Sequence, residues 1–95
     1  MEREEIVSAL VQIILDVLCM GSDESPKETD RFYYELKADS LDMFDIAHQM
    51  ERDICISIAD EDMEVFEDRE LTVGGLVDFA YRKKQERYAG YKNML

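Results

Sequence analysis

The sequence predicts a small all-α fold, a bundle of three main helices plus one short helix. Apolar side chains recur at the i, i+3, i+4 spacing of an amphipathic helix in three separate stretches. The 95 residues are 46% hydrophobic, which is enough for one core in one domain but too small a chain for a large catalytic cleft. Four glycines and one proline leave few chain breaks, and this disfavours a fold of many short strands.

The first helix is predicted over residues 3–19, and Gly21 is expected to stop it. Its apolar positions share one wide face: Ile6, Val7, Leu10, Ile14, Val17 and Leu18. Residues 21–31 are polar and contain the only proline, so they predict a loop. Three apolar residues then anchor the loop to the core: Phe32, Tyr33 and Leu36.

The second helix is predicted from Ser40 to about Asp53, with Asp39 or Ser40 as its N-terminal cap. One apolar line on this helix is expected to face the core: Ile46, Ala47, Met50 and Ile54. A second line lies a quarter-turn or more away: Leu41, Phe44 and His48. Carboxylates fill much of the remaining surface: Asp42, Asp45, Glu51 and Asp53.

The second half of the chain is predicted to hold a linker, a short helix and a last helix. Residues 54–58 alternate apolar and polar side chains, but no other strand-like run could pair with them, so we expect an extended linker. Residues 60–66 indicate one or two helical turns with acids at the favourable N-terminal end. Thr72 caps a last helix to about Tyr88, and residues 89–95 are expected to fray. The chain is therefore predicted to be a single domain, residues 1–95, with its core in about residues 4–88.

Charge and composition restrict the partners. The net charge is −12, and residues 21–70 hold 17 acidic and 5 basic side chains. Such a field repels nucleic acid and anionic membranes and attracts basic protein surfaces, although plain solubility would explain the same charge. The apolar runs are too short for a membrane span, and the acidic start does not resemble a signal peptide, so we expect a cytoplasmic protein.

The two cysteines and the lone histidine favour no metal or catalytic site. Cys19 and Cys55 lie in apolar stretches and are expected to be buried thiols in a reducing compartment. No Cys/His cluster has metal-ligand spacing. Residues 60–64 are rich in acids but lack the central glycine of a calcium-binding loop. We therefore expect no metal.

The residues around Ser40 carry a family resemblance. The segment at the mouth of the second helix reads Leu36-Lys37-Ala38-Asp39-Ser40-Leu41-Asp42, and it resembles the attachment motif of acyl carrier proteins. The similarity continues over about residues 4–84. It implies a carrier, with no catalytic residues of its own, that a separate phosphopantetheinyl transferase modifies with magnesium. The transferase moves 4′-phosphopantetheine from coenzyme A to Ser40, flanked by Asp39 and Leu41, and the arm carries acyl groups as thioesters.

Elementary chemistry at Ser40 agrees with that implication, although a plain N-cap role is the alternative. A phosphodiester would lie near a helix N-terminus, where backbone N–H groups and the helix dipole favour negative charge. His48, the only histidine, is two helical turns away, so a self-activating serine dyad is not expected.

The second helix is also expected to meet partner enzymes. By resemblance, Leu41, Phe44 and His48 match apolar positions that family members expose. Asp39, Asp42, Asp45 and Glu51 match acids that meet basic docking patches of acyl-loading and acyl-processing enzymes. Ordinary core filling is the alternative for Leu41 and Phe44, and a solvated helix face is the alternative for the acids. The carrier is expected to be a monomer.

Several positions depart from the family pattern. Lys37 replaces a glycine, His48 a frequent methionine and Arg52 a frequent acid, and residues 65–71 lengthen the link into the last helix. These departures suit specialised carriers, polyketide-like or D-alanyl, as much as fatty acid synthesis. A cavity for the acyl chain is another possibility, lined by Met43, Ile46, Ala47, Met50, Ile58, Met63, Phe66 and Leu76, with ordinary gap filling as the alternative. From another class, the chain could be an acidic helical adaptor without a prosthetic group.

Overall fold

The described part of the chain contains four α-helices and one 3₁₀ turn, joined by loops. The computed structural model describes residues 2–21 and 23–94, with side chains as far as Glu86. The elements are α1 (Arg3–Val17), α2 (Ser40–Asp53), the 3₁₀ turn η1 (Asp60–Asp62), α3 (Met63–Glu67) and α4 (Val73–Met94). This arrangement confirms the predicted all-α bundle of three main helices and one short helix. The bounds of α2 agree with the prediction, and residues 54–58 form a linker outside any helix or strand.

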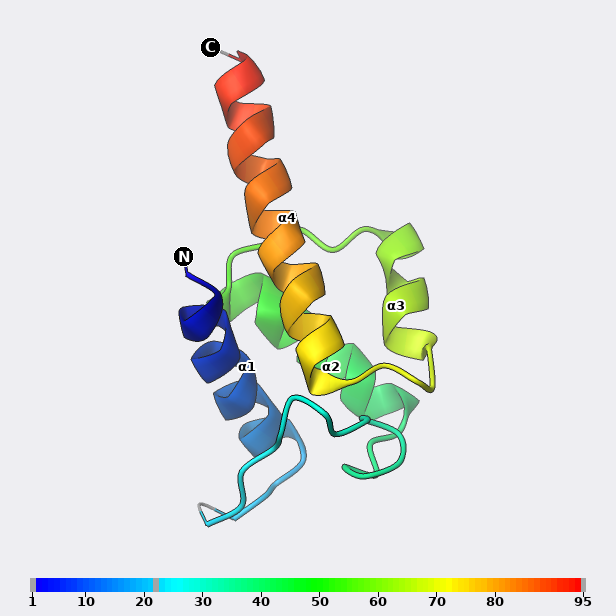
Figure 1. Ribbon diagram of the computed structural model, residues 1–95. Coiled ribbons are helices and arrows are strands. Elements are labelled where there is room, and N and C mark those ends of the chain that lie inside the picture. Colours follow the sequence, from blue (N-terminus) through cyan, green and yellow to red (C-terminus); the bar gives the residue numbers. More distant parts are fainter. Residues whose placement is uncertain (1, 22, 95) are drawn as a thin grey trace.

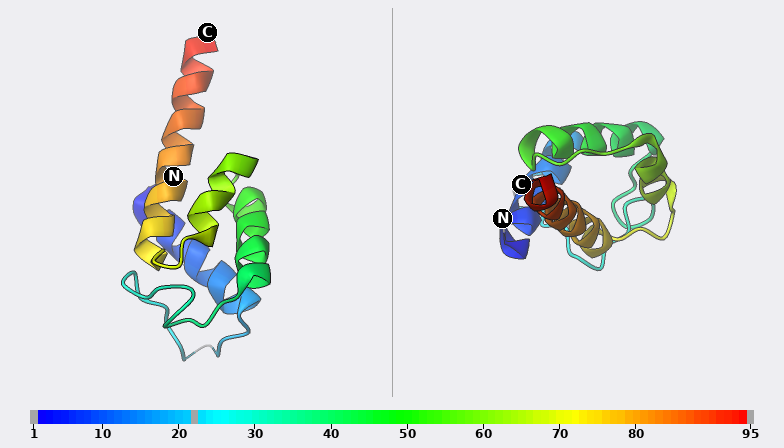
Figure 2. Two further views of the ribbon diagram at one scale, coloured as in Figure 1. Left: turned by 90° about the vertical axis from the view of Figure 1, so that its right-hand side faces the viewer. Right: turned by 90° about the horizontal axis from the view of Figure 1, so that it is seen from above.

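The core lies between α1, α2 and α4. α1 packs against both α2 and α4, and α3 packs against α2. Figure 1 shows α4 beside α1, with its C-terminal part extending past the other helices; Figure 2 shows the same from two further directions. The largest fully buried side chains come from every helix and from the long loop: Phe32, Phe66, Ile6, Leu10, Ile13, Ile14, Met43, Ile46, Met50, Ile54, Leu76 and Val73. The short α3 is held by Phe66, whose ring meets Phe79 of α4 edge to face at 5.8 Å between centroids.

The long loop before α2 is attached to the beginning of α4. Arg31 and Thr72 form an isolated antiparallel bridge, and the Gly74 N–H donates to the Glu28 carbonyl at 2.9 Å. A Cβ atom at Gly74 would lie 3.1 Å from that same oxygen, so glycine permits the close approach at a cost in helix propensity. As predicted, Phe32 is buried in the core, and Tyr33 and Leu36 pack against it.

The prediction that both thiols are buried is wrong. Cys19 and Cys55 are exposed, because each follows a helix end where the chain turns into the left-handed region, with φ of 54° and 60°. Each Sγ points back to a carbonyl of the last turn, Asp16 O at 4.0 Å and Arg52 O at 3.6 Å. The turn at Cys19 also ends α1 two residues earlier than predicted, before Gly21 is reached. The apolar neighbours of each cysteine fill the core in its place.

The last helix is longer than predicted. Thr72 caps it as expected, since its Oγ1 accepts a hydrogen bond from the Gly75 N–H at 3.0 Å. The helix then continues to Met94 rather than to about Tyr88. No proline follows Tyr88, and a single glycine weakens a helix without ending it. Leu95 lies outside the described residues, and fraying of residues 89–95 stays a prediction.

Candidate functional site

The mouth of α2 presents Ser40 to solvent. Ser40 is the first residue of the helix and is exposed. Asp39 is the N-cap: its Oδ1 accepts from the Asp42 N–H at 2.9 Å, while Asp42 Oδ2 accepts from the Asp39 N–H at 3.1 Å. This reciprocal capping box gives both carboxylates a structural role. The Ser40 hydroxyl has no hydrogen-bond partner among the described residues, so the fold does not need this hydroxyl for a contact of its own.

The turn into this site is strained. Lys37 has φ of 56°, in the left-handed region where side chains with a Cβ are disfavoured by roughly 1–2 kcal/mol. The resemblance described above implies a glycine at this position, and Lys37 indeed adopts a backbone conformation that glycine adopts at lower cost. The next residue, Ala38, is buried, and its N–H donates to the Phe32 carbonyl at 2.7 Å. These contacts fix the direction from which the chain enters α2.

Two pockets flank Ser40, and both are lined by Tyr33, Ser40 and Glu67. The first, of about 240 Å³, is mainly apolar and lies between α2 and α3; its other lining residues are Leu41, Met43, Phe44, Met63 and Phe66. The second, of about 430 Å³, is the more polar of the two; its other lining residues are Ala38, Asp39 and Arg69. A group attached to the Ser40 hydroxyl could therefore enter either pocket, and the site fits a covalently held arm.

Tyr33 is part of the wall that the two pockets share. Its hydroxyl donates to the Phe66 carbonyl at 2.7 Å, which ties the long loop to α3. Burial raises the pKa of the Tyr33 phenol, and the nearby Arg69 guanidinium opposes that rise. The guanidinium lies over the Tyr33 ring, 5.4 Å from its centroid. Tyr33, Glu67 and Arg69 are not among the site residues predicted from sequence, although the long link of residues 65–71 was the available signal.

The outer face of α2 exposes large apolar side chains. Leu41 is 74% exposed and Phe44 60%, so core filling does not explain either residue. His48 and Asp45 are exposed beside them. Glu51 is exposed too, but its Oε2 accepts a hydrogen bond from the Ile58 N–H at 3.0 Å and so supports the linker after α2. Of the predicted cavity residues, Met43, Met63 and Phe66 line the apolar pocket, whereas Ile46, Met50 and Leu76 lie fully inside the core.

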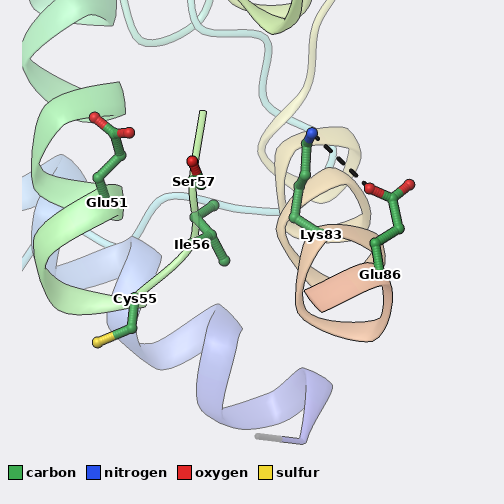
Figure 3. A pocket seen from close by; sticks show the side chains of 6 residues that line it. All are labelled: Glu51, Cys55, Ile56, Ser57, Lys83 and Glu86. Atoms are coloured by element: carbon green, nitrogen blue, oxygen red, sulfur yellow. Dashed lines mark ion pairs between the residues drawn. The ribbon is translucent and has the colours of Figure 1, made fainter. Parts of the chain in front are cut away.

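A third pocket, of about 640 Å³, lies at the opposite end of α2. Its lining residues come from α2, the following linker and α4: Glu51, Cys55, Ile56, Ser57, Lys83 and Glu86. Figure 3 shows Lys83 and Glu86 together on α4, joined by an ion pair, with the Cys55 sulfur pointing away from them. Lys83 pairs with Asp62 at 2.7 Å and with Glu86 at 3.9 Å. This cation is therefore already neutralised, and Ser40 does not line this pocket.

None of the described helices is long and apolar enough to cross a membrane. Within the same residues, no group of three or more His, Cys, Asp or Glu side chains is arranged to hold a metal ion.

Comparison with known proteins identifies the class to which this fold and site belong. Residues 8–80 match the family model described as a phosphopantetheine attachment site. The chain is also 32% identical to an acyl carrier protein of Borreliella burgdorferi (strain ZS7), over 88% of this chain and 99% of that one. An acyl carrier protein of Clostridium perfringens (strain SM101) is 37% identical over 74% and 86% of the two chains. An acyl carrier protein of Thermotoga maritima is 35% identical, over 85% of this chain and 94% of that one.

The chain belongs to the acyl carrier protein family. Proteins of this family are carriers that bear phosphopantetheine and work with partner enzymes; they are not enzymes themselves. The resemblance seen around Ser40 is thus confirmed at the level of family and cofactor. The adaptor alternative, which lacks a prosthetic group, is not favoured by this result.

Proposed function

We propose that Ser40 is the residue that carries the 4′-phosphopantetheine arm. The observation that carries this proposal is the position of Ser40: exposed at the first residue of α2, without a hydrogen-bond partner among the described residues, and lining two pockets at once. It lies within the region that matches the attachment-site family. In the proposed reaction the Ser40 oxygen forms a bond to phosphorus and the phosphoanhydride bond of coenzyme A breaks. Adenosine 3′,5′-bisphosphate leaves with the electron pair of that bond, and a base of the transferase takes the hydroxyl proton.

The residues near Ser40 hold the site open and do not activate the hydroxyl. Asp39 and Asp42 cap the helix and keep its first turn rigid. Asp39 and Leu41 flank the modified oxygen and form the edge that the transferase must recognise. When bound, the arm supplies a terminal thiol that carries acyl groups as thioesters. The apolar pocket between α2 and α3 is the place where this chain can shield an apolar cargo from water.

The outer face of α2 is the proposed docking surface for partner enzymes. Leu41 and Phe44 supply apolar contact, His48 extends that line, and Asp42, Asp45 and Glu51 supply negative charge. Such charges steer encounter with a basic patch and set its register, while contributing little net affinity. That combination suits a carrier, because it must dissociate after each transfer. The phosphopantetheinyl transferase and the acyl-loading and acyl-processing enzymes would share this surface.

The cargo is proposed to belong to a dedicated pathway, polyketide-like or D-alanyl, rather than to general fatty acid synthesis. The support is local: Lys37 adds a positive charge beside the attachment site, and Arg52 makes the far end of α2 less acidic. Efficient loading by a malonyl transferase, with full support of fatty acid synthesis, would contradict this assignment. The cytoplasmic location and the monomeric state expected from the sequence remain predictions.

Intact mass measurement tests the attachment site directly. The chain is incubated with coenzyme A, magnesium and a broad-specificity phosphopantetheinyl transferase. We expect a gain of one phosphopantetheine in the parent and none in Ser40→Ala. The matched control is Ser57→Ala, because Ser57 is also exposed but lies on the linker after α2. Modification of Ser40→Ala, or no modification of a folded parent while another carrier is modified, would overturn the proposal.

A further inference from the structure

The charges around Ser40 leave a phosphodiester with few favourable neighbours. Asp39 and Asp42 place two carboxylates at the helix mouth, and their capping box already engages the Asp42 N–H. Glu67 adds a third carboxylate on the wall of both pockets. A phosphodiester on Ser40 would carry a negative charge into this group, and like charges at such a separation repel. The helix dipole alone offers only about half a unit of positive charge against them.

One basic side chain lines a pocket that Ser40 also lines. Arg69, in the link between α3 and α4, is the basic residue that lines the polar pocket, and Ser40 lines the same pocket. Arg3, Arg31 and Arg52 each form at least one ion pair, whereas Arg69 and Arg82 form none with the described side chains. Its guanidinium lies over the Tyr33 ring, and Tyr33 is in turn fixed by its bond to the Phe66 carbonyl. The guanidinium therefore lines the same pocket as Ser40 and has no ion-pair partner among the described side chains.

We propose that Arg69 binds the phosphodiester of the arm on Ser40, with Tyr33 as the surface that orients the guanidinium. This inference rests on the proposed attachment at Ser40. A guanidinium suits phosphate oxygens because its planar donors can make two parallel hydrogen bonds. Arg69 is a positioning residue: it holds the root of the arm in the polar pocket and leaves the apolar pocket, which Tyr33 also lines, for the cargo.

The test compares the chain with and without its arm, in the parent and in three variants. Arg69→Gln removes the charge and Arg69→Lys keeps it. Arg82→Gln is the matched control, because Arg82 also lies over an aromatic ring, that of Phe79 at 5.7 Å, but lines neither pocket beside Ser40. Intact mass confirms that the arm is attached. Urea unfolding gives the folding equilibrium constant of each form, and NMR follows the side-chain Nε–H signals of the arginines.

We expect attachment of the arm to move the Arg69 Nε–H signal and to leave that of Arg82 in place. The ratio of folding constants, armed over unarmed, should be about twofold to fivefold higher in the parent than in Arg69→Gln, the range of an exposed ion pair. Arg82→Gln should stay near the parent, and Arg69→Lys should fall between the parent and Arg69→Gln, because an ammonium keeps the charge but cannot make two parallel hydrogen bonds. Equal ratios in the parent and Arg69→Gln, or an unmoved Arg69 signal, would overturn the inference while the attachment at Ser40 stands. A parent chain that gains no arm overturns both, and the mass spectrum distinguishes that case.

Discussion

The two faces of α2 use similar side chains in opposite ways. On the inner face Met43, Ile46 and Met50 are at most 1% exposed, and they contact the core shared by α1 and α4. On the outer face Leu41 and Phe44 are 74% and 60% exposed. The fold explains the inner residues completely and the outer ones hardly at all. This contrast in exposure is the observation that supports the docking surface proposed above.

The largest expected effect is a difference in stability between substitutions on the inner and outer faces of α2. Ile46→Ala should lower the free energy of unfolding by about 2–5 kcal/mol, because it leaves a cavity in a close-packed core. Leu41→Ala should change it by less than about 0.5 kcal/mol, since a surface residue loses little burial. Urea unfolding at constant pH measures both. A loss of more than about 2 kcal/mol in Leu41→Ala would show that the outer face contributes to folding after all.

The second prediction separates the faces by partner binding. Phe44→Ser should weaken recognition by the phosphopantetheinyl transferase by roughly tenfold, about 1.4 kcal/mol, in the range of a moderate interface residue. The measurement is the rate of arm attachment as a function of carrier concentration. Tyr34→Ser is the matched control, because Tyr34 is also an exposed aromatic residue, 45% exposed, but lies in the loop before α2. Equal losses in both variants would remove the special role of the outer face.

The sequence predicted α2 and its two apolar lines better than it predicted the pockets around Ser40. Period-3.6 spacing located α2 and both of its apolar lines, because that signal is local. The capping residue was also readable, since Asp39 precedes the first periodic position. The polar pocket could not be predicted, because Tyr33, Ser40 and Arg69 come from three separate segments that only the folded structure brings together. The exposed thiols were missed for a related reason: neither cysteine carries a sequence signal for a left-handed turn.

The third prediction concerns α3, the short helix that packs against α2. Lys83 of α4 pairs at 2.7 Å with Asp62, at the turn that begins α3, and both side chains are about a fifth exposed or less. The hydrogen bond from Lys83 lowers the pKa of Asp62, and the same bond raises the pKa of Lys83. Lys83→Met should cost about 1 kcal/mol of stability at neutral pH.

The pH dependence of this pair has a definite sign. Because the folded pKa of Asp62 is lowered, its contribution is present above the unfolded value of about 3.9 and is lost as pH falls through the folded value. Because the folded pKa of Lys83 is raised, its contribution is complete below about 10.4 and is lost as pH rises through the folded value. Urea unfolding from acid to neutral pH should show a shallower acid loss in Lys83→Met than in the parent. Identical slopes would mean that the pair does not stabilise α3.

The smallest expected effect lies at the two ends of α2. Lys37 precedes the helix with φ of 56°, and Cys55 follows it with φ of 60°, so both are non-glycine residues in the left-handed region. Lys37→Gly should raise the free energy of unfolding by about 0.5–1 kcal/mol, since relief of the steric cost exceeds the added chain entropy. Cys55→Gly should act similarly, although it also removes the contact of Sγ with the Arg52 carbonyl. If Lys37→Gly stabilises the chain but slows arm attachment, the strained lysine serves recognition at the Ser40 end. If Lys37→Gly leaves the rate of attachment unchanged, the strain at Lys37, like that at Cys55, affects only the stability of the fold.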